Sequence, residues 1–239
     1  TEEDNTCDYD LDDDGVLDVD EILGCTNSTA NNYNSDATDD DGTCDFDLDD
    51  DGVLDTEEIS GCTDIFSETY DSEATDDDGT CQYFQPGSKG ELKAAVDEWI
   101  ANSTDANETY GHIKVWDTSL ITDMSSLFYD KTTFNEDISE WDVSNVSDMS
   151  RMFNNAESFN QDISDWDVSN VVDMKYMFFS AGSFNQNISS WDVSSVTSMD
   201  YMFDYTDDLS DDNKCAIHSS FDSNDNWPYD WEEYCTSDE

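Results

Sequence analysis

The sequence predicts two successive repeat architectures: small irregular modules linked by disulfides, followed by an α/β solenoid of short strands and short helices. Three observations predict this. Cysteines recur with a 37-residue period in the first third, tryptophans recur with a 25-residue period in the second half, and most aromatic residues follow residue 100. The expected domains are the modules (1–83), a linker with a capping helix (84–108), four repeats (109–208) and a disulfide-closed C-terminal cap (209–239).

The charge is strongly acidic. The 239 residues include 62 Asp and Glu against 7 Lys and Arg, a net charge of −55, and residues 1–83 contain 30 acids and no base. Such a surface repels nucleic acids and anionic lipid headgroups, which leaves divalent cations, cationic partners or very salty water as its surroundings. No apolar run is long enough for direct membrane insertion.

The first five cysteines are regularly spaced in a segment without lysine, which predicts disulfides and an oxidising compartment. "TEEDNTC" aligns with "TDDDGTC" at 38–44 and 75–81, so we expect the chain to begin inside a module. This favours the pairs Cys25–Cys44 and Cys62–Cys81, with the partner of Cys7 upstream. The alternative, Cys7–Cys25 with Cys44–Cys62, leaves Cys81 unpaired.

Two aspartate-rich segments, "CDYDLDDDGVLDVDEILGC" and "CDFDLDDDGVLDTEEISGC", have the spacing of a twelve-residue calcium loop. Such a loop supplies oxygens from positions 1, 3, 5, 7, 9 and 12, with glycine at position 6. We therefore expect two Ca²⁺ sites, with further carboxylates offered by "TDDDG" at 38–42 and 75–79. An acidic linker without specific metal, or adaptation to salt, are the alternatives. The predicted ligands are Asp10, Asp12, Asp14, the Val16 carbonyl, Asp18 and Glu21 in the first loop, and Asp47, Asp49, Asp51, the Val53 carbonyl, Asp55 and Glu58 in the second.

These loops resemble EF-hand loops, and more closely those of dockerins and thrombospondin type 3 repeats. The resemblance covers about twelve residues per copy. No helix precedes either loop, and only one short helical turn, "VDEILG", follows the first. The resemblance therefore implies a structural calcium staple and not a sensor, with Leu17 and Leu54 at the apolar anchor position.

The second half repeats rows such as "FNQDISDWDVSNVVDMKYMFFSAGS". A period of this length predicts a solenoid of the leucine-rich repeat type. Within a copy, "ISxWDVS" predicts a strand and "SDMSxMF" a short helix, while Asn145 and Asn170 are expected to satisfy backbone groups at a turn. Trp166 should be buried between Trp141 and Trp191, with Asp165 in solvent. The in-phase positions are Trp116, Trp141, Trp166 and Trp191, then Met124, Met149, Met174 and Met199, then Phe128, Phe153, Phe178 and Phe203.

Both ends of the repeats have candidate caps. Ser88 is expected to begin a helix whose buried face carries Leu92, Val96, Trp99 and Ile100. At the other end, a Cys215–Cys235 disulfide encloses an aromatic segment that can cover the open end of the solenoid, namely Phe221, Trp227, Tyr229 and Trp231.

The "WDVSNVSDMSRMF" rows and the capping segment closely resemble the BspA-like leucine-rich repeat family of surface proteins, over residues 88–208. This resemblance implies an extracellular or cell-surface protein that engages other molecules, and some members are linked to adhesion.

No catalytic motif is present, and His112 and His218 are too few to suggest an active site, so we predict that the protein is not an enzyme. The expected function is a secreted, calcium-binding structural or adhesive surface protein whose solenoid contacts proteins or glycans. The alternatives are a self-assembling subunit of an extracellular filament and an accessory module of a secreted degradative enzyme. Acceptor sequences for N-glycosylation occur at Asn27, Asn102, Asn107, Asn145 and Asn187.

Overall fold

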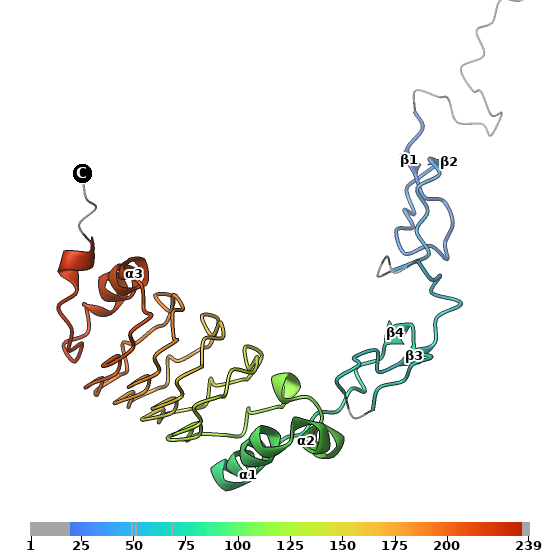
Figure 1. Cartoon of the computed structure of the whole chain (residues 1–239). Coiled ribbons are helices and arrows are strands. Elements are labelled where there is room, and N and C mark those ends of the chain that lie inside the picture. The colour runs from blue at the N-terminus through green and yellow to red at the C-terminus, as the bar shows by residue number, and fades with distance from the viewer. Residues whose placement is uncertain (1–19, 49, 51, 68, 236–239) are drawn as a thin grey trace, which may run out of the picture. The chain divides into compact units, whose positions relative to one another are not determined.

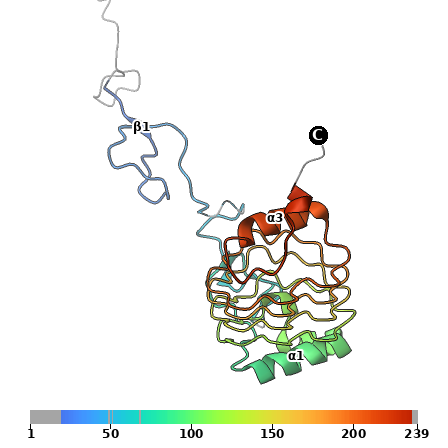
Figure 2. The same cartoon turned by 90° about the vertical axis from the view of Figure 1, so that its left-hand side faces the viewer.

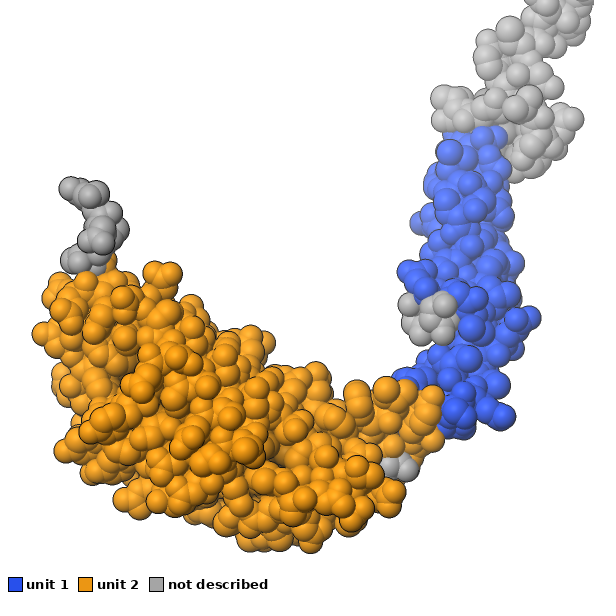
Figure 3. Space-filling view, viewed as in Figure 1, with its two compact units in different colours: residues 1–63, 71–79 blue, residues 64–70, 80–239 orange. Residues whose placement is uncertain are grey.

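The computed structural model describes residues 20–235, except 49, 51 and 68. The chain forms two compact units, residues 1–63 with 71–79 (unit 1) and residues 64–70 with 80–239 (unit 2), shown in Figure 3. The sequence placed this boundary after residue 83. Residues 64–70 and 80–83 instead belong to unit 2. Within that unit, Tyr83 donates a hydrogen bond of 2.7 Å to Asp64, and the Phe66 ring lies 4.7 Å from the ring of His112.

The described part of unit 1 contains two copies of the same small motif (Figure 1). Strand β1 (Leu23–Gly24) pairs in parallel with β2 (Asp39–Asp40), and β3 (Ser60–Gly61) pairs in the same way with β4 (Asp76–Asp77). A side chain on Gly61 would place its Cβ 3.0 Å from that of Ala74. Glycine precedes the cysteine because the two backbone segments approach this closely.

The motifs bury little apolar surface. Cys25 and Cys62 are their most buried side chains, whereas Leu48 and Leu54 are 75% and 47% exposed. Leu54 therefore does not form the buried anchor that the loop pattern suggested, because no core lies there to receive it. Leu17 lies outside the described residues.

The favoured disulfide pattern is confirmed where it can be seen. Cys25 bonds Cys44, which excludes the alternative pairing, and Cys62 and Cys81 are both disulfide-bonded. Cys7 lies outside the described residues.

The first helix of unit 2 is α1 (Lys89–Ala101). Ser88 caps it as predicted, with its Oγ accepting the Glu91 N–H at 3.3 Å. Leu92, Val96 and Trp99 are buried as expected, and Ile100 is partly buried against the same core. Helix α2 (Ser103–Tyr110), capped by Asn102, and the 3-10 turn η1 (Ile113–Val115) follow.

The repeats form stacked coils (Figure 1), which Figure 2 shows as layers between α1 and α3. Parallel bridges connect Asp123 to Asp148, Asp148 to Asp173, and Asp173 to Ser198, so equivalent residues of successive copies lie side by side. The N–H of Met124 donates to the Asp148 carbonyl at 2.9 Å, and alternate residues of the same segment continue this ladder. The 25-residue phase read from the sequence is thereby confirmed.

The expected strand and short helix within each copy are not formed. Residues 117–210, all described, contain only turns and isolated bridges. Two residues per copy have a positive φ, a conformation that interrupts an α-helix, and in the first three copies their N–H groups donate to the next coil. Backbone hydrogen bonds between coils therefore replace those that a helix would form within one coil. The positions are Ser126, Asp130, Arg151, Asn155, Tyr176, Ser180, Tyr201 and Tyr205, with φ between 56° and 60°.

The core consists of the predicted aromatic and methionine positions. Phe128, Phe153, Phe178 and Phe203 form one stack, with ring centroids 5.2 to 5.5 Å apart. Trp166 is 4% exposed and stacks on Trp191 at 6.5 Å, while Asp165 is exposed. The burial predicted for these two neighbours is confirmed.

The C-terminal end is capped as predicted. Helix α3 (Asp211–Phe221) and the 3-10 turn η2 (Glu232–Cys235) are joined by the Cys215–Cys235 disulfide. The rings of Trp227, Tyr229 and Trp231 lie 5.6 to 6.2 Å from that of Phe203 in the last coil. In the part of the chain that the structure describes, no helix is both long and apolar enough to cross a membrane.

Candidate metal centre

The second aspartate-rich loop is closed by its own hydrogen bonds. Asp47 Oδ2 accepts the Gly52 N–H at 2.9 Å, which joins positions 1 and 6 of the loop. Gly52 has a φ of +95°, a conformation that other residues rarely adopt, so glycine is needed at this turn. Asp55, at position 9, accepts the Leu48 N–H at 2.8 Å through Oδ1. Asp47 and Asp55, at positions 1 and 9, thus each accept a backbone N–H group of the loop.

One carboxylate oxygen in the described part of this loop has no described partner. Asp47 Oδ1 is buried and accepts no hydrogen bond from any residue that the structure describes. Burial of a charged oxygen without a partner is costly, because its hydration is lost and not replaced. A cation at this oxygen would supply the missing interaction. Among the described residues, this single oxygen is the feature that fits a hard divalent cation at position 1.

The remaining expected ligands are only partly visible. Asp49 and Asp51 lie outside the described residues, as do all the expected first-loop ligands except Glu21. Among the residues that are described, no three His, Cys, Asp or Glu side chains converge closely enough to hold a metal ion. Asp55 Oδ2 accepts a hydrogen bond of 2.8 Å from Asn31 Nδ2. This contact ties the loop to the preceding motif, and the sequence pattern gave no sign of it.

The "TDDDG" segments act as turns. Asp40 Oδ1 accepts the Gly42 N–H at 2.9 Å, and Asp41 Oδ1 accepts the Thr43 N–H at 2.9 Å. Hydrogen bonds from the side chain and backbone of Thr43 hold the pKa of Asp41 below its ordinary value, so this exposed carboxylate stays ionised. The aspartates of 38–42 therefore have a structural use that requires no ion.

Several aspartates of the repeats also accept hydrogen bonds within local turns. Asp142 and Asp167 each accept the N–H of the serine two residues later, at 2.9 and 3.1 Å, and equivalent aspartates do the same in other coils. The two histidines have packing roles: His112 Nδ1 accepts the Lys114 N–H, and His218 Nδ1 accepts the indole N–H of Trp227 at 3.0 Å. These aspartates and histidines thus have structural roles. The aspartates close D-x-S turns, and the histidines accept hydrogen bonds from neighbouring residues.

Two ladders of asparagine satisfy backbone groups along the stack. Asn145 Nδ2 donates to the Ser119 carbonyl at 2.9 Å, and Asn170 Nδ2 donates to Ser144 at 2.8 Å, as predicted. The sequence analysis missed the second ladder, in which the Oδ1 of Asn160 accepts the Asn185 N–H at 2.8 Å. The invariant spacing of the "FN" pair across the rows was the signal that could have revealed it.

The five N-glycosylation acceptor asparagines are all exposed. Three of them also use Oδ1 locally: Asn27 accepts the Thr29 N–H at 3.0 Å, Asn102 caps α2, and Asn187 accepts the Ser189 N–H at 3.0 Å. These contacts leave the amide nitrogen accessible.

The comparison with known proteins concerns the repeats. Residues 97–215 match the family described as "Mycoplasma protein of unknown function, DUF285". The matched residues overlap those over which the chain resembles BspA-like surface proteins, 88–208, and the match agrees with that resemblance. It does not extend to the aspartate-rich segment, and no curated protein or solved structure matches the chain. The family description assigns no activity.

Proposed function

We propose that this chain is a calcium-binding structural and adhesive component of an extracellular surface, in which calcium-stapled modules carry a leucine-rich-repeat-type solenoid. The observation that carries the proposal is the buried, unpartnered Oδ1 of Asp47, in a loop turned by Gly52 at φ +95°. Each motif has a disulfide cysteine and little else as its core, so an ion is the remaining source of stabilisation.

The proposed solenoid is a non-catalytic scaffold for protein or glycan contacts. Its support is the stack of coils held by 25-residue bridges, together with carboxylates and histidines that are used in turns and packing. Disulfides and a surface-repeat family are compatible with an extracellular or surface location. Secretion of the chain is part of the proposal.

The test is calorimetric titration of the whole chain with Ca²⁺, compared with the variants Asp47→Asn and Asp50→Asn. Asp47 is the position-1 ligand, whereas Asp50 lies between ligand positions and its positive φ suits asparagine equally well. Both changes remove one negative charge. We expect Asp47→Asn to lose one binding site and Asp50→Asn to keep it, with a dissociation constant on the order of 10⁻⁴–10⁻³ M. Equal binding by the two variants would refute the assignment.

A further inference from the structure

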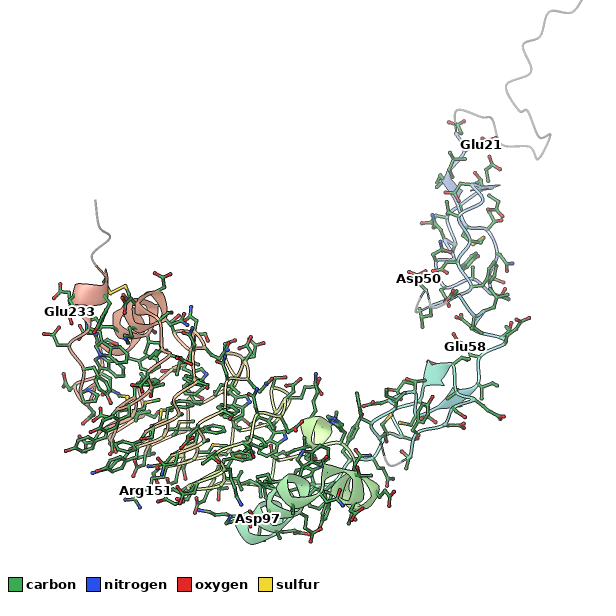
Figure 4. All side chains as sticks on the ribbon, in the orientation of Figure 1. Glu21, Asp50, Glu58, Asp97, Arg151 and Glu233 are labelled. Atoms are coloured by element: carbon green, nitrogen blue, oxygen red, sulfur yellow. A yellow bond between two sulfur atoms is a disulfide. The ribbon has the colours of Figure 1, made fainter. Side chains whose placement is uncertain are left out.

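Unit 2 has a groove on the face where the positive-φ residues lie. It has a volume of about 640 Å³, within the range of ligand-binding sites. Helix α1 and the first three coils line it, and we name it the tyrosine groove for the residues Lys93, Tyr129, Arg151, Asn155, Tyr176 and Phe179. Figure 4 labels Arg151 at the outer edge of the coils.

Arg151 differs from every other basic residue of the chain. Each of the six lysines has a carboxylate oxygen within 3.5 Å, in pairs such as Lys89–Asp123, Lys131–Asp97 and Lys175–Asp200. Arg151, the single arginine, forms no such ion pair with any described residue, although the chain contains 62 acids. An exposed guanidinium in this setting retains its full capacity for bidentate binding of a carboxylate.

The carboxylates around the groove are already engaged. Asp97 pairs with Lys93 and Lys131, Asp130 accepts a hydrogen bond of 2.7 Å from Asn155, and Asp200 pairs with Lys175. The charges of Asp97 and Asp200 are therefore balanced by lysine, whereas Asp130 is hydrogen-bonded to a neutral amide. Arg151 contributes an uncompensated positive charge in an otherwise acidic protein.

The Tyr176 ring of the groove is arranged for an anion and not for a sugar ring. Tyr176 stacks on Tyr201, with centroids 5.0 Å apart and an interplanar angle of 8°. The Arg151 guanidinium and the Lys175 ammonium each lie 5.4 Å from the Tyr176 centroid. Because these contacts occupy the faces of Tyr176, this residue presents its ring edge, which carries positive partial charge, and its phenol hydroxyl. A saccharide that stacks on aromatic faces finds no free face on Tyr176.

We propose that the tyrosine groove binds a carboxylate of an aspartate-rich segment from a second copy of this chain, with Arg151 as the recognition residue. Charge complementarity identifies the occupant: residues 1–83 carry 30 acids and no base. Asp40 and Asp41 are exposed, and their turns use only Oδ1, as described above. The inference rests on the structural role proposed above and deepens it by naming a self-assembly contact.

Sedimentation velocity of the whole, calcium-saturated chain tests this contact, with Arg151→Gln compared with Lys214→Gln. Both variants remove one positive charge, and Lys214 also lies over a tyrosine ring, 4.7 Å from the Tyr234 centroid, but in the C-terminal cap. Glutamine keeps most of the arginine stem, so packing on Tyr176 is retained. We expect concentration-dependent association in the wild type and in Lys214→Gln, and at least a roughly tenfold weaker association in Arg151→Gln.

Two further experiments identify the segment that occupies the groove. The variant Asp40→Asn/Asp41→Asn preserves both turn acceptors and should weaken association, and a free "SDATDDDGT" peptide should compete. A monomeric wild type, or equal association of the Arg151→Gln and Lys214→Gln variants, would overturn the proposal. Competition by an oligouronate but not by the peptide would also overturn it, in favour of a glycan. Calcium titration of Arg151→Gln should match the wild type, so a failure here is distinct from a failure of the calcium assignment.

Discussion

At the scale of single residues, each repeat contributes one indole to the core, and Trp166 is the interior example. Its ring is 4% exposed, and its Nε1 donates to the Ile138 carbonyl at 3.3 Å. Trp166→Ala removes a large aromatic and leaves a cavity, which should lower the free energy of unfolding by about 3–5 kcal/mol. The neighbouring Asp165→Ala should change it by no more than about 0.5 kcal/mol. Thermal melts measure both variants, and equal effects would contradict the assigned phase of the repeat.

The two asparagine ladders use opposite ends of the amide, which allows a matched comparison. Asn160 accepts through Oδ1, with Gln186 Nε2 at 2.7 Å as a second donor, whereas Asn170 donates through Nδ2. Aspartate keeps the acceptor but removes the donor. Asn160→Asp should therefore be nearly neutral, while Asn170→Asp should lose about 1–3 kcal/mol of unfolding free energy by facing a carboxylate to the Ser144 carbonyl. Both variants add the same charge, so chemical denaturation that shows equal losses would contradict these roles.

At the scale of elements, sequence patterns predicted what depends on side-chain periodicity and missed what depends on the backbone. The cap Ser88, the buried face of α1 and the Cys215–Cys235 staple follow from local signals and are present. The strand and helix expected within each copy are absent: two residues per copy have a positive φ, and in the first three copies their N–H groups donate to the next coil. No residue type marks those positions, which hold serine, aspartate, arginine, asparagine and tyrosine. Helices α2 and α3 were missed because they are short and polar.

Helix α1 is joined to the first coil by an ion pair whose contribution depends on pH. Partial burial raises the pKa of Asp97, but hydrogen bonds from Lys131 and Lys93 outweigh it and hold this pKa below its ordinary value of 3.8. A lowered folded-state pKa adds stability above the unfolded-state value, and that stability is lost as the pH falls through 3.8 toward the folded-state pKa. Asp97→Asn should be less stable than the wild type at neutral pH. The difference should shrink below pH 3.8, and a constant gap in denaturation midpoint would contradict the ion pair.

At the scale of the whole molecule, the two units are stabilised by different means. Unit 2 has a continuous buried core from Leu92 to Phe221. Residues 1–83 carry 30 acids without a base, and their described motifs bury little more than Cys25, Cys62 and Ala30. Chain entropy and charge repulsion therefore oppose folding there, and disulfides offset only part of that cost. The expected loop ligands rest on sequence spacing and stay a prediction, whereas the Asn31–Asp55 contact and the unpartnered oxygen of Asp47 required three-dimensional structure.

The central claim is that calcium is required for the fold of unit 1 and not for that of the coils. Two-dimensional amide NMR of the whole chain, recorded with Ca²⁺ and then with excess chelator, tests it most directly. We predict that chelation collapses the dispersed resonances of residues 20–63 and 71–79, because unneutralised carboxylates repel one another, while those of 88–221 remain unchanged. Retention of the dispersed unit 1 resonances in chelator would contradict the account.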